Sequence, residues 1–308
     1  MIQAPPTISL HGLSKRYGDH VAVDGLTIEV PAGVVAGFVG PNGAGKTTTM
    51  AMLLGLVTPS AGGGTVLGHP LDDPAAYLHR VGALIEGPAF YAGLTGAQNL
   101  AVLATIAGHD SAQIPGLLEL VGLGARGDDR FRAYSMGMKQ RLGIAASLLG
   151  DPDLLILDEP INGLDPAGVH EIRGLIGRLA DGRRTVFVSS HVLTELEQVC
   201  DWLIVVDHGA LVYQGPASDL GRGGSAIAAV PEHEADLRRL ERLLNAAGHD
   251  SEISGGEVLI AVDGCEPRRL AADVNRAAGA DGIVLAELGP HRTTLEERYL
   301  ATVNGADR

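Results

Sequence analysis

Short apolar runs alternate with longer amphipathic stretches along the first 220 residues of the chain. Runs with almost no polar position are typical of strands in a sheet that is covered on both faces. We expect strands at Val34–Val39, Val81–Ile85, Leu154–Leu157, Thr185–Ser189, Leu203–Val206 and Leu211–Gln214. The intervening stretches predict helices at Thr48–Leu54, Ala97–Ala107, Ile114–Val121, Lys139–Leu149, Val169–Ala180 and Val192–Val199. This alternation predicts an α/β fold.

The pattern changes after the stretch Gly221–Ser225, whose composition is typical of a linker. Beyond it we expect strands and helices in the order β-α-β-β-α-β, which is the ferredoxin-like arrangement. The elements are Ala226–Val230, Ala235–Ala247, Ser251–Ser254, Val258–Val262, Arg268–Ala278 and Ile283–Leu288, with a last helix at Thr294–Thr302. The predicted domains are therefore residues 1–220 and a small α+β domain at 226–308, with a linker at 221–225.

A glycine-rich segment separates the strand at Val34–Val39 from the helix that follows it. It matches G-x-x-x-x-G-K-[ST], is followed by Thr48, and reads Gly40-Pro41-Asn42-Gly43-Ala44-Gly45-Lys46-Thr47. Glycines let backbone N–H groups surround phosphate oxygens, and the helix N-terminus adds the positive end of its dipole. The lysine can reach the β- and γ-phosphates, and the threonine hydroxyl can ligate Mg²⁺. We expect a nucleotide site; the alternative is an ordinary glycine-rich turn.

Two carboxylates, Asp158 and Glu159, follow the apolar run Leu154–Leu157 directly. A strand-end carboxylate such as Asp158 holds Mg²⁺ in P-loop ATPases. Glu159 stands one residue further, where a carboxylate can polarise an attacking water. Strand ends are often acidic, so this pair alone is weak evidence for a catalytic site. It indicates such a site only together with the glycine loop upstream. Together the two motifs predict an ATPase that uses ATP and Mg²⁺.

Composition and charge narrow the function further. The net charge is −14, and residues 1–225 and 226–308 are both acidic. Nucleic-acid binding normally leaves a basic surface, because neutralised phosphates supply much of the affinity. Cys200 and Cys265 lack metal-ligand spacing, and no apolar run reaches the roughly 18 residues of a membrane span. No secretory signal is visible at the N-terminus. We therefore expect a cytosolic protein and no nucleic-acid partner.

A serine and glycine segment opens the helix that precedes the acidic strand, and it reads Tyr134-Ser135-Met136-Gly137-Met138-Lys139-Gln140-Arg141. Here the chain resembles the ATP-binding subunits of ATP-binding-cassette (ABC) transporters, whose signature is usually L-S-G-G-Q. The Y-S-x-G-M-K-Q-R form is similar to the subgroup of daunorubicin- and bacitracin-resistance exporters. In that family, Ser135 and Gly137 would contact nucleotide held by the opposite subunit. The alternative is an ordinary helix start in which Ser135 is the N-cap.

The resemblance implies roles for four further positions. Tyr17 resembles the aromatic residue that stacks on adenine; the alternative is a surface or edge-strand tyrosine. The segment Asn162–Asp165 resembles the loop that crosses the dimer interface, with Asp165 near nucleotide; the alternative is an Asx turn before a helix. His191 resembles the switch histidine that contacts the γ-phosphate, whereas a lone histidine is more often structural. Glu86 stands where the family usually has a glutamine that ligates Mg²⁺; the alternative is an exposed loop glutamate.

The resemblance implies a P-loop cassette with a helical signature subdomain over about residues 7–220, and an ATPase that drives an exporter. Glu159, His191 and Lys46 would be catalytic, and two copies would close head to tail on ATP. The partner would be a separate integral membrane permease, contacted within residues 87–105, with the chain peripheral on the cytoplasmic face. The cargo stays open between an antibiotic, a peptide and a lipid-like compound.

Two other functions fit parts of this pattern. One is a soluble relative that acts on ribosomes or chromosomes, but such proteins usually have two cassettes or a long coiled coil, and this chain has neither. The other is an ATP-dependent switch without turnover, which would have no need of Glu159. The role of residues 226–308 is open between homodimer contact, regulation and permease docking.

Overall fold

The computed structural model describes residues 5–180, 182–196, 198–220, 226–262 and 266–291. The chain divides into two compact units, Met1–Ala217 and Ser218–Arg308. The predicted linker at 221–225, Cys265 and the predicted helix Thr294–Thr302 lie outside the described residues. Within the described ranges, no helix is both long and apolar enough to cross a membrane.

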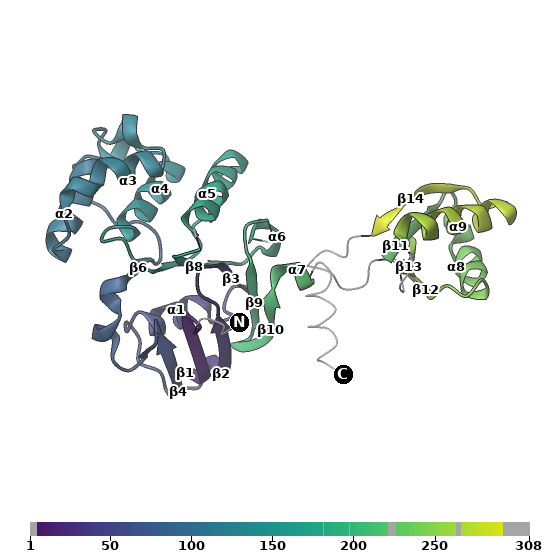
Figure 1. The fold of residues 1–308 in the computed structure, drawn as a ribbon, viewed down its shortest axis with the longest axis horizontal. Helices are drawn as coiled ribbons and strands as arrows, with labels where there is room; N and C mark the ends of the chain where they lie inside the picture. Colours follow the sequence, from purple (N-terminus) through teal and green to yellow (C-terminus); the bar gives the residue numbers. More distant parts are fainter. Residues whose placement is uncertain (1–4, 181, 197, 221–225, 263–265, 292–308) are drawn as a thin grey trace. The chain divides into compact units, whose positions relative to one another are not determined.

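A six-stranded sheet forms the centre of the first unit (Figure 1). Its strand order is β10-β9-β3-β8-β7-β6, and all pairs are parallel except β9 with β10. The strands are β3 (Val35–Val39), β6 (Val81–Leu84), β7 (Leu154–Leu157), β8 (Thr185–Ser190), β9 (Trp202–Asp207) and β10 (Ala210–Pro216). Every residue of β3, β7 and β8 is buried, which explains why these segments read as continuous apolar runs.

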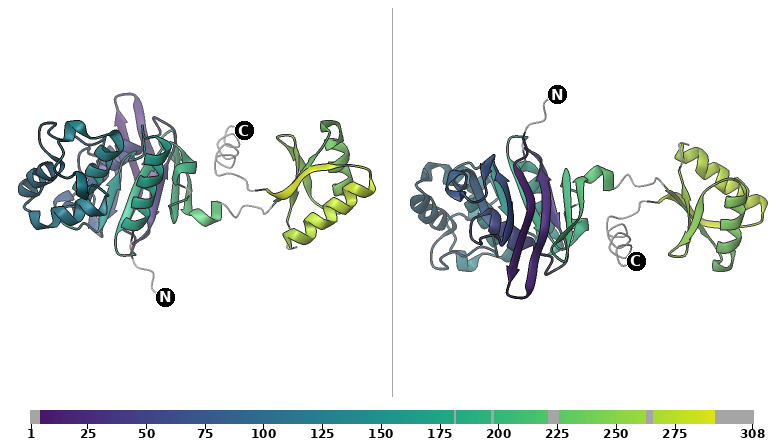
Figure 2. Two further views of the ribbon diagram at one scale, coloured as in Figure 1. Left: turned by 90° about the horizontal axis from the view of Figure 1, so that it is seen from above. Right: turned by 90° about the horizontal axis from the view of Figure 1, so that it is seen from below.

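A second sheet in this unit, which the apolar runs did not predict, has the strand order β2-β1-β4-β5. It consists of β1 (Ile8–Tyr17), β2 (His20–Val30), β4 (Ala61–Val66) and β5 (His69–Pro70). The strands β1 and β2 form a long antiparallel hairpin (Figure 2), and bulges interrupt its register. Helix α1 (Lys46–Leu53) shares one hydrophobic core with both sheets, through Met50, Met52 and Leu53.

Five further helices of this unit lie close to the predicted positions. They are α2 (Gly96–Ala107), α3 (Ile114–Leu120), α4 (Met136–Ser147), α5 (Pro166–Leu179) and α6 (Leu193–Leu196). The first three form a helical group beside β6 (Figure 1). Two helices begin three residues earlier than predicted, because the side chains of Ser135 and Asp165 cap α4 and α5.

The second unit has the element order that its sequence pattern predicts. Its elements are β11 (Ala226–Pro231), α8 (Leu237–Ala246), β12 (Ser251–Ser254), β13 (Glu257–Ala261), α9 (Pro267–Ala280) and β14 (Leu285–His291). The sheet is antiparallel in the order β12-β13-β11-β14, and both helices pack on one face of it (Figure 2). The short helix α7 (Ala217–Leu220) precedes it. The ferredoxin-like assignment stays a prediction.

Candidate nucleotide site

The predicted catalytic groups meet at one edge of the parallel sheet. Strands β3, β8 and β7 are neighbours and run parallel, so their carboxyl ends lie side by side. The phosphate loop follows β3, the pair Asp158 and Glu159 follows β7, and His191 follows β8. Ligands of open α/β sheets bind at this carboxyl edge. The topology therefore brings together three motifs that are far apart in the sequence.

Glycine is required by the backbone geometry at two positions of the phosphate loop. Gly45 has a φ of 90°, and a Cβ atom there would lie 2.3 Å from the carbonyl oxygen of Ala22. A Cβ atom on Gly40 would lie 2.2 Å from the carbonyl oxygen of Val206. Gly43 also has a positive φ, 86°, but open space surrounds it. The loop is thus fixed against two neighbouring strands and open where phosphate would enter.

The ammonium group of Lys46 is held inside this loop. Its Nζ atom donates hydrogen bonds to the carbonyl oxygens of Gly40 at 2.6 Å and Pro41 at 3.2 Å. The same atom lies 3.4 Å from Oε1 of Glu159, and the lysine is only 6% exposed. A buried ammonium needs such acceptors to offset its desolvation. The carboxylate after β7 therefore contacts the loop lysine directly.

Oxygen atoms suited to Mg²⁺ lie between the loop and β7. The hydroxyl of Thr47 donates to Oδ2 of Asp158 at 2.8 Å. Hydroxyl and carboxylate oxygens are ligands that Mg²⁺ prefers, and neighbouring ligands in its octahedral shell are about 3 Å apart. Among the described residues, no three His, Cys, Asp or Glu side chains gather as a metal site. The two side chains thus fit a Mg²⁺ ion that takes its remaining oxygens from phosphate and water.

Ser189, which the sequence did not single out, holds both carboxylate residues in place. Its hydroxyl donates to Oδ1 of Asp158 at 2.6 Å and accepts a hydrogen bond from the backbone N–H of Glu159 at 2.8 Å. Ser189 is 1% exposed and lies in β8, the strand that pairs with β7. The one sequence feature that could have indicated this role is that Ser189 is a polar residue near the end of an otherwise apolar strand.

Glu159 lies between the loop lysine and the histidine that follows β8. Its Oε2 atom is 2.8 Å from Nδ1 of His191, while its Oε1 atom faces Lys46. The residue has a φ of 47°, a conformation that costs free energy for any residue except glycine. Strain of this kind occurs at functional sites. The turn presents the carboxylate toward the phosphate loop.

A hollow of about 250 Å³ lies in front of these groups. Its lining includes predicted residues from the phosphate loop, helix α1 and the acidic pair: Asn42, Gly43, Gly45, Lys46, Thr47, Thr48 and Glu159. The lining also includes Asn162, from the segment predicted to cross the dimer interface, and two residues that were not singled out, His20 and Ala22. His20 begins β2, and its closeness to the predicted aromatic residue Tyr17 was the signal available for it.

The lining does not include Gly40, Pro41 and Ala44 of the phosphate loop or His191, and it also lacks four predicted nucleotide contacts from other parts of the chain. The ring of Tyr17 is 49% exposed and lies 4.9 Å from Nζ of Lys15. The side chains of Ser135 and Asp165 accept hydrogen bonds at helix N-termini, from the N–H groups of Met138 and Gly168. A Cβ atom on Gly137 would lie 4.0 Å from Cδ2 of Leu164, an ordinary van der Waals contact. The roles assigned to these residues stay predictions.

Glu86 follows β6, the edge strand beside β7. The backbone N–H of Asp158 donates to the carbonyl of Leu84, so the two strand ends are joined. Glu86 is exposed, has a φ of 56° and, within the described part of the chain, makes no side-chain hydrogen bond or ion pair. Its predicted contact with Mg²⁺ therefore stays a prediction.

Comparisons with known proteins agree with this geometry. The sequence pattern of the family described as "ABC transporter" matches residues 23–162. The chain is 35% identical over 303 residues to the bacitracin transport ATP-binding protein BcrA of Enterococcus faecalis, covering 97% of this chain and 96% of that protein. It is 38% identical over 251 residues to the daunorubicin/doxorubicin resistance ATP-binding protein DrrA of Streptomyces peucetius, covering 79% and 76%.

A solved structure described as the ATP-binding subunit of an ABC transporter resembles the cassette. It superposes with a TM-score of 0.62 at 29% sequence identity, covering 70% of this chain and 92% of that chain. The alignment with BcrA, in contrast, spans almost the whole chain, including most of the second unit. The cassette thus has relatives of known structure, and the second unit is shared with at least one relative.

Proposed function

Because the chain belongs to the ABC transporter family of ATP-binding subunits, we propose that it hydrolyses ATP at the carboxyl edge of the parallel sheet and thereby drives an exporter through a separate permease. The observation that carries this proposal is the position of the Glu159 carboxylate, which contacts both Lys46 and His191 beside Asp158. A site that binds ATP only as a switch would not require this carboxylate.

The phosphate loop would bind the nucleotide. Its backbone N–H groups and the N-terminus of α1 face the phosphates, and Lys46 leaves the carbonyls of Gly40 and Pro41 to contact phosphate oxygens. Thr47 and Asp158 would hold Mg²⁺, with Glu86 as a further oxygen ligand. When bound, Mg²⁺ neutralises charge on the β- and γ-phosphates.

Glu159 would orient the attacking water and accept its proton, acting as general base. His191, held to Glu159, would place its imidazole against the γ-phosphate, and Lys46 would stabilise charge on the transferring group. Tyr17 would stack on adenine. Ser135, Gly137 and Asp165 would complete the site of a second copy, so the active form would be a head-to-tail homodimer.

The names of two relatives support a role in transport, and we propose that this role is export, with the chain at the cytoplasmic face of the membrane. One transports bacitracin and another confers daunorubicin resistance, according to their names. We infer that this chain serves a permease for an antibiotic, a peptide or a lipid-like compound, and contacts it within residues 87–105. Tyr91 in this stretch is 65% exposed, as expected of a contact surface in the isolated subunit.

The test is Mg²⁺-dependent ATPase activity of the purified chain as a function of protein concentration. A homodimer predicts a rate that rises faster than linearly. Glu159→Gln should lower turnover by at least about 100-fold, which is the contribution of a general base, while ATP still binds. The matched control is Glu232→Gln, an exposed glutamate in the second unit. Unchanged turnover in Glu159→Gln would contradict the proposed role of this residue.

A further inference from the structure

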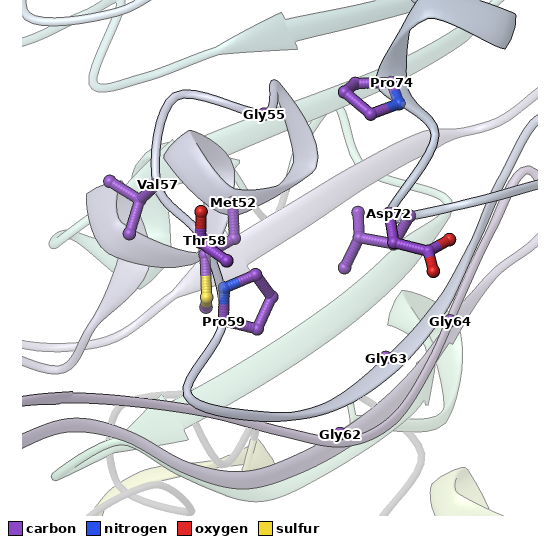
Figure 3. A pocket seen from close by; sticks show the side chains of 11 residues that line it. Met52, Gly55, Val57, Thr58, Pro59, Gly62, Gly63, Gly64, Asp72 and Pro74 are labelled. Atoms are coloured by element: carbon purple, nitrogen blue, oxygen red, sulfur yellow. The ribbon is translucent and has the colours of Figure 1, made fainter.

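A second hollow, of about 440 Å³, lies between the end of α1 and strand β4 (Figure 3). None of the residues of the phosphate loop or the acidic pair lines it. Gly62, Gly63 and Gly64 run along one side, and Met52 and Thr58 lie on the other. We call this hollow the β4 groove. The proposed ATPase cycle gives it no role.

The edge of β4 beside this groove is open. On the side away from β1, the strand β5 pairs only with Thr65 and Val66 of β4. Among the described strands, none continues this pairing along Ala61–Gly64. One backbone hydrogen bond, from the N–H of Leu71 to the carbonyl of Gly64, closes the far end. An open edge is a template for another strand unless charge, proline or a covering loop protects it.

The face of β4 next to this edge is also uncovered at one position. Gly63 has no atom within 4 Å of the position its Cβ would take. The wall behind it is apolar, with Met52 only 1% and Leu71 only 6% exposed. An extended segment that adds to a sheet edge gains affinity from main-chain hydrogen bonds and specificity from a pocket for its side chains. The β4 groove provides both features.

Charge favours a basic occupant. Asp72 is the one charged side chain among the lining residues, and Asp73 follows it; both are exposed. The ammonium of Lys15, next to the groove, already donates a hydrogen bond to the carbonyl oxygen of Thr58 at 2.8 Å. A second copy of this chain bound through the same groove would bring no basic lining residue to face Asp72. Cytoplasmic segments of membrane proteins are, in contrast, enriched in lysine and arginine.

We propose that the β4 groove binds an extended, basic segment from the cytoplasmic side of the permease. The segment pairs with the open edge of β4, places an apolar side chain against Met52 and Leu71, and places a lysine or arginine near Asp72. This inference rests on the proposed function, which requires a permease. It adds a second contact to the one within residues 87–105.

The experiment uses the full chain in cells that contain its membrane partner. A photo-crosslinking benzoylphenylalanine replaces Thr58, an exposed residue at the groove. The expected product is an adduct with a lysine- or arginine-containing cytoplasmic segment of an integral membrane protein, located by mass spectrometry. Gly63→Val fills the groove without a clash and should abolish the adduct, and so should Asp72→Lys.

Two controls make the result decisive. Gly289→Val also places a valine at a strand glycine with open space, but in the second unit, and should leave the adduct intact. A crosslinker at Tyr91 reports on the permease itself. A Tyr91 adduct without a Thr58 adduct would overturn the groove proposal and leave the proposed function standing.

The remaining outcomes are also informative. A Thr58 adduct that survives Gly63→Val, or that joins a soluble protein or a second copy of this chain, overturns the groove proposal. Absence of a membrane-protein adduct from both probes would count against the permease, and hence against the proposed function as well.

Discussion

At the scale of single residues, Ser189 decides how the two carboxylates are presented. Replacing it with alanine removes a donor to Asp158 and an acceptor for the N–H of Glu159 in a buried setting. We expect Ser189→Ala to lower the free energy of unfolding by roughly 1–3 kcal/mol and to reduce Mg²⁺-dependent turnover. Ser190→Ala is the matched control, since that hydroxyl bonds Val192 and Glu195 instead. Urea denaturation and ATPase assays would check both; equal effects on turnover would argue against a special role for Ser189.

The glycines of the phosphate loop should differ in how well they tolerate replacement by alanine. Gly45→Ala places a methyl group 2.3 Å from the carbonyl oxygen of Ala22 and also forces a positive φ. Gly43→Ala has only the second cost, which is of order 1 kcal/mol. We expect Gly45→Ala to abolish ATP binding and Gly43→Ala to weaken it by roughly tenfold at most. Titration with a fluorescent ATP analogue measures the difference, and similar losses in both variants would show that strain alone matters.

At the scale of elements, Asp151, in the loop after α4, pairs with the arginines that precede β8. Its hydrogen bond with Arg183, 2.8 Å long, lowers the pKa of the carboxyl below the usual 3.8, and Arg184 adds to this effect. A lowered pKa in the folded state stabilises the fold above the unfolded pKa, and this contribution is lost as the pH falls through the folded pKa. The carboxyl is 60% exposed, so solvent screening keeps the contribution below about 1 kcal/mol.

The variant Asp151→Asn isolates that contribution, because asparagine also tolerates the positive φ of 54° at this position. We expect the variant to be less stable than the parent at neutral pH, and the difference to vanish in acid. Urea unfolding of both proteins at several pH values measures this. A difference that does not change with pH would mean that the ion pair is not its cause.

The elements that could be predicted from the sequence are those marked by an unbroken run of apolar residues or by a motif of consecutive residues. In the segment from Val35 to the end of α1, the strand, the phosphate loop and the helix follow one another directly in the sequence. They could therefore be predicted without knowledge of the tertiary fold. Strands β1 and β2 mix buried and exposed residues and contain bulges, and only the second half of β2 alternates regularly, so their apolar positions form no continuous run. The role of Ser189 depends on the pairing of β7 with β8 and was therefore inaccessible before the topology was known. The lining residue Ala22 likewise reaches the site only through the fold.

At the scale of the whole molecule, the two compact units should respond differently to nucleotide. In the Glu159→Gln variant, ATP at about 100 times its Kd stabilises the unit that binds it by about 2.7 kcal/mol. We expect calorimetry of the full chain to show two transitions, of which only one moves upward with Mg²⁺ and ATP. A shift of both transitions together would show that the second unit takes part in the nucleotide response.

The contacts of Lys46 have a consequence for how ATP enters. Within the chain, the lysine has three oxygen partners, and one belongs to the proposed general base, Glu159. Binding is therefore an exchange of partners and not the filling of an empty space. The measured affinity for ATP is a difference between two sets of contacts, so a substitution that weakens the internal set can tighten ATP binding while it removes catalysis.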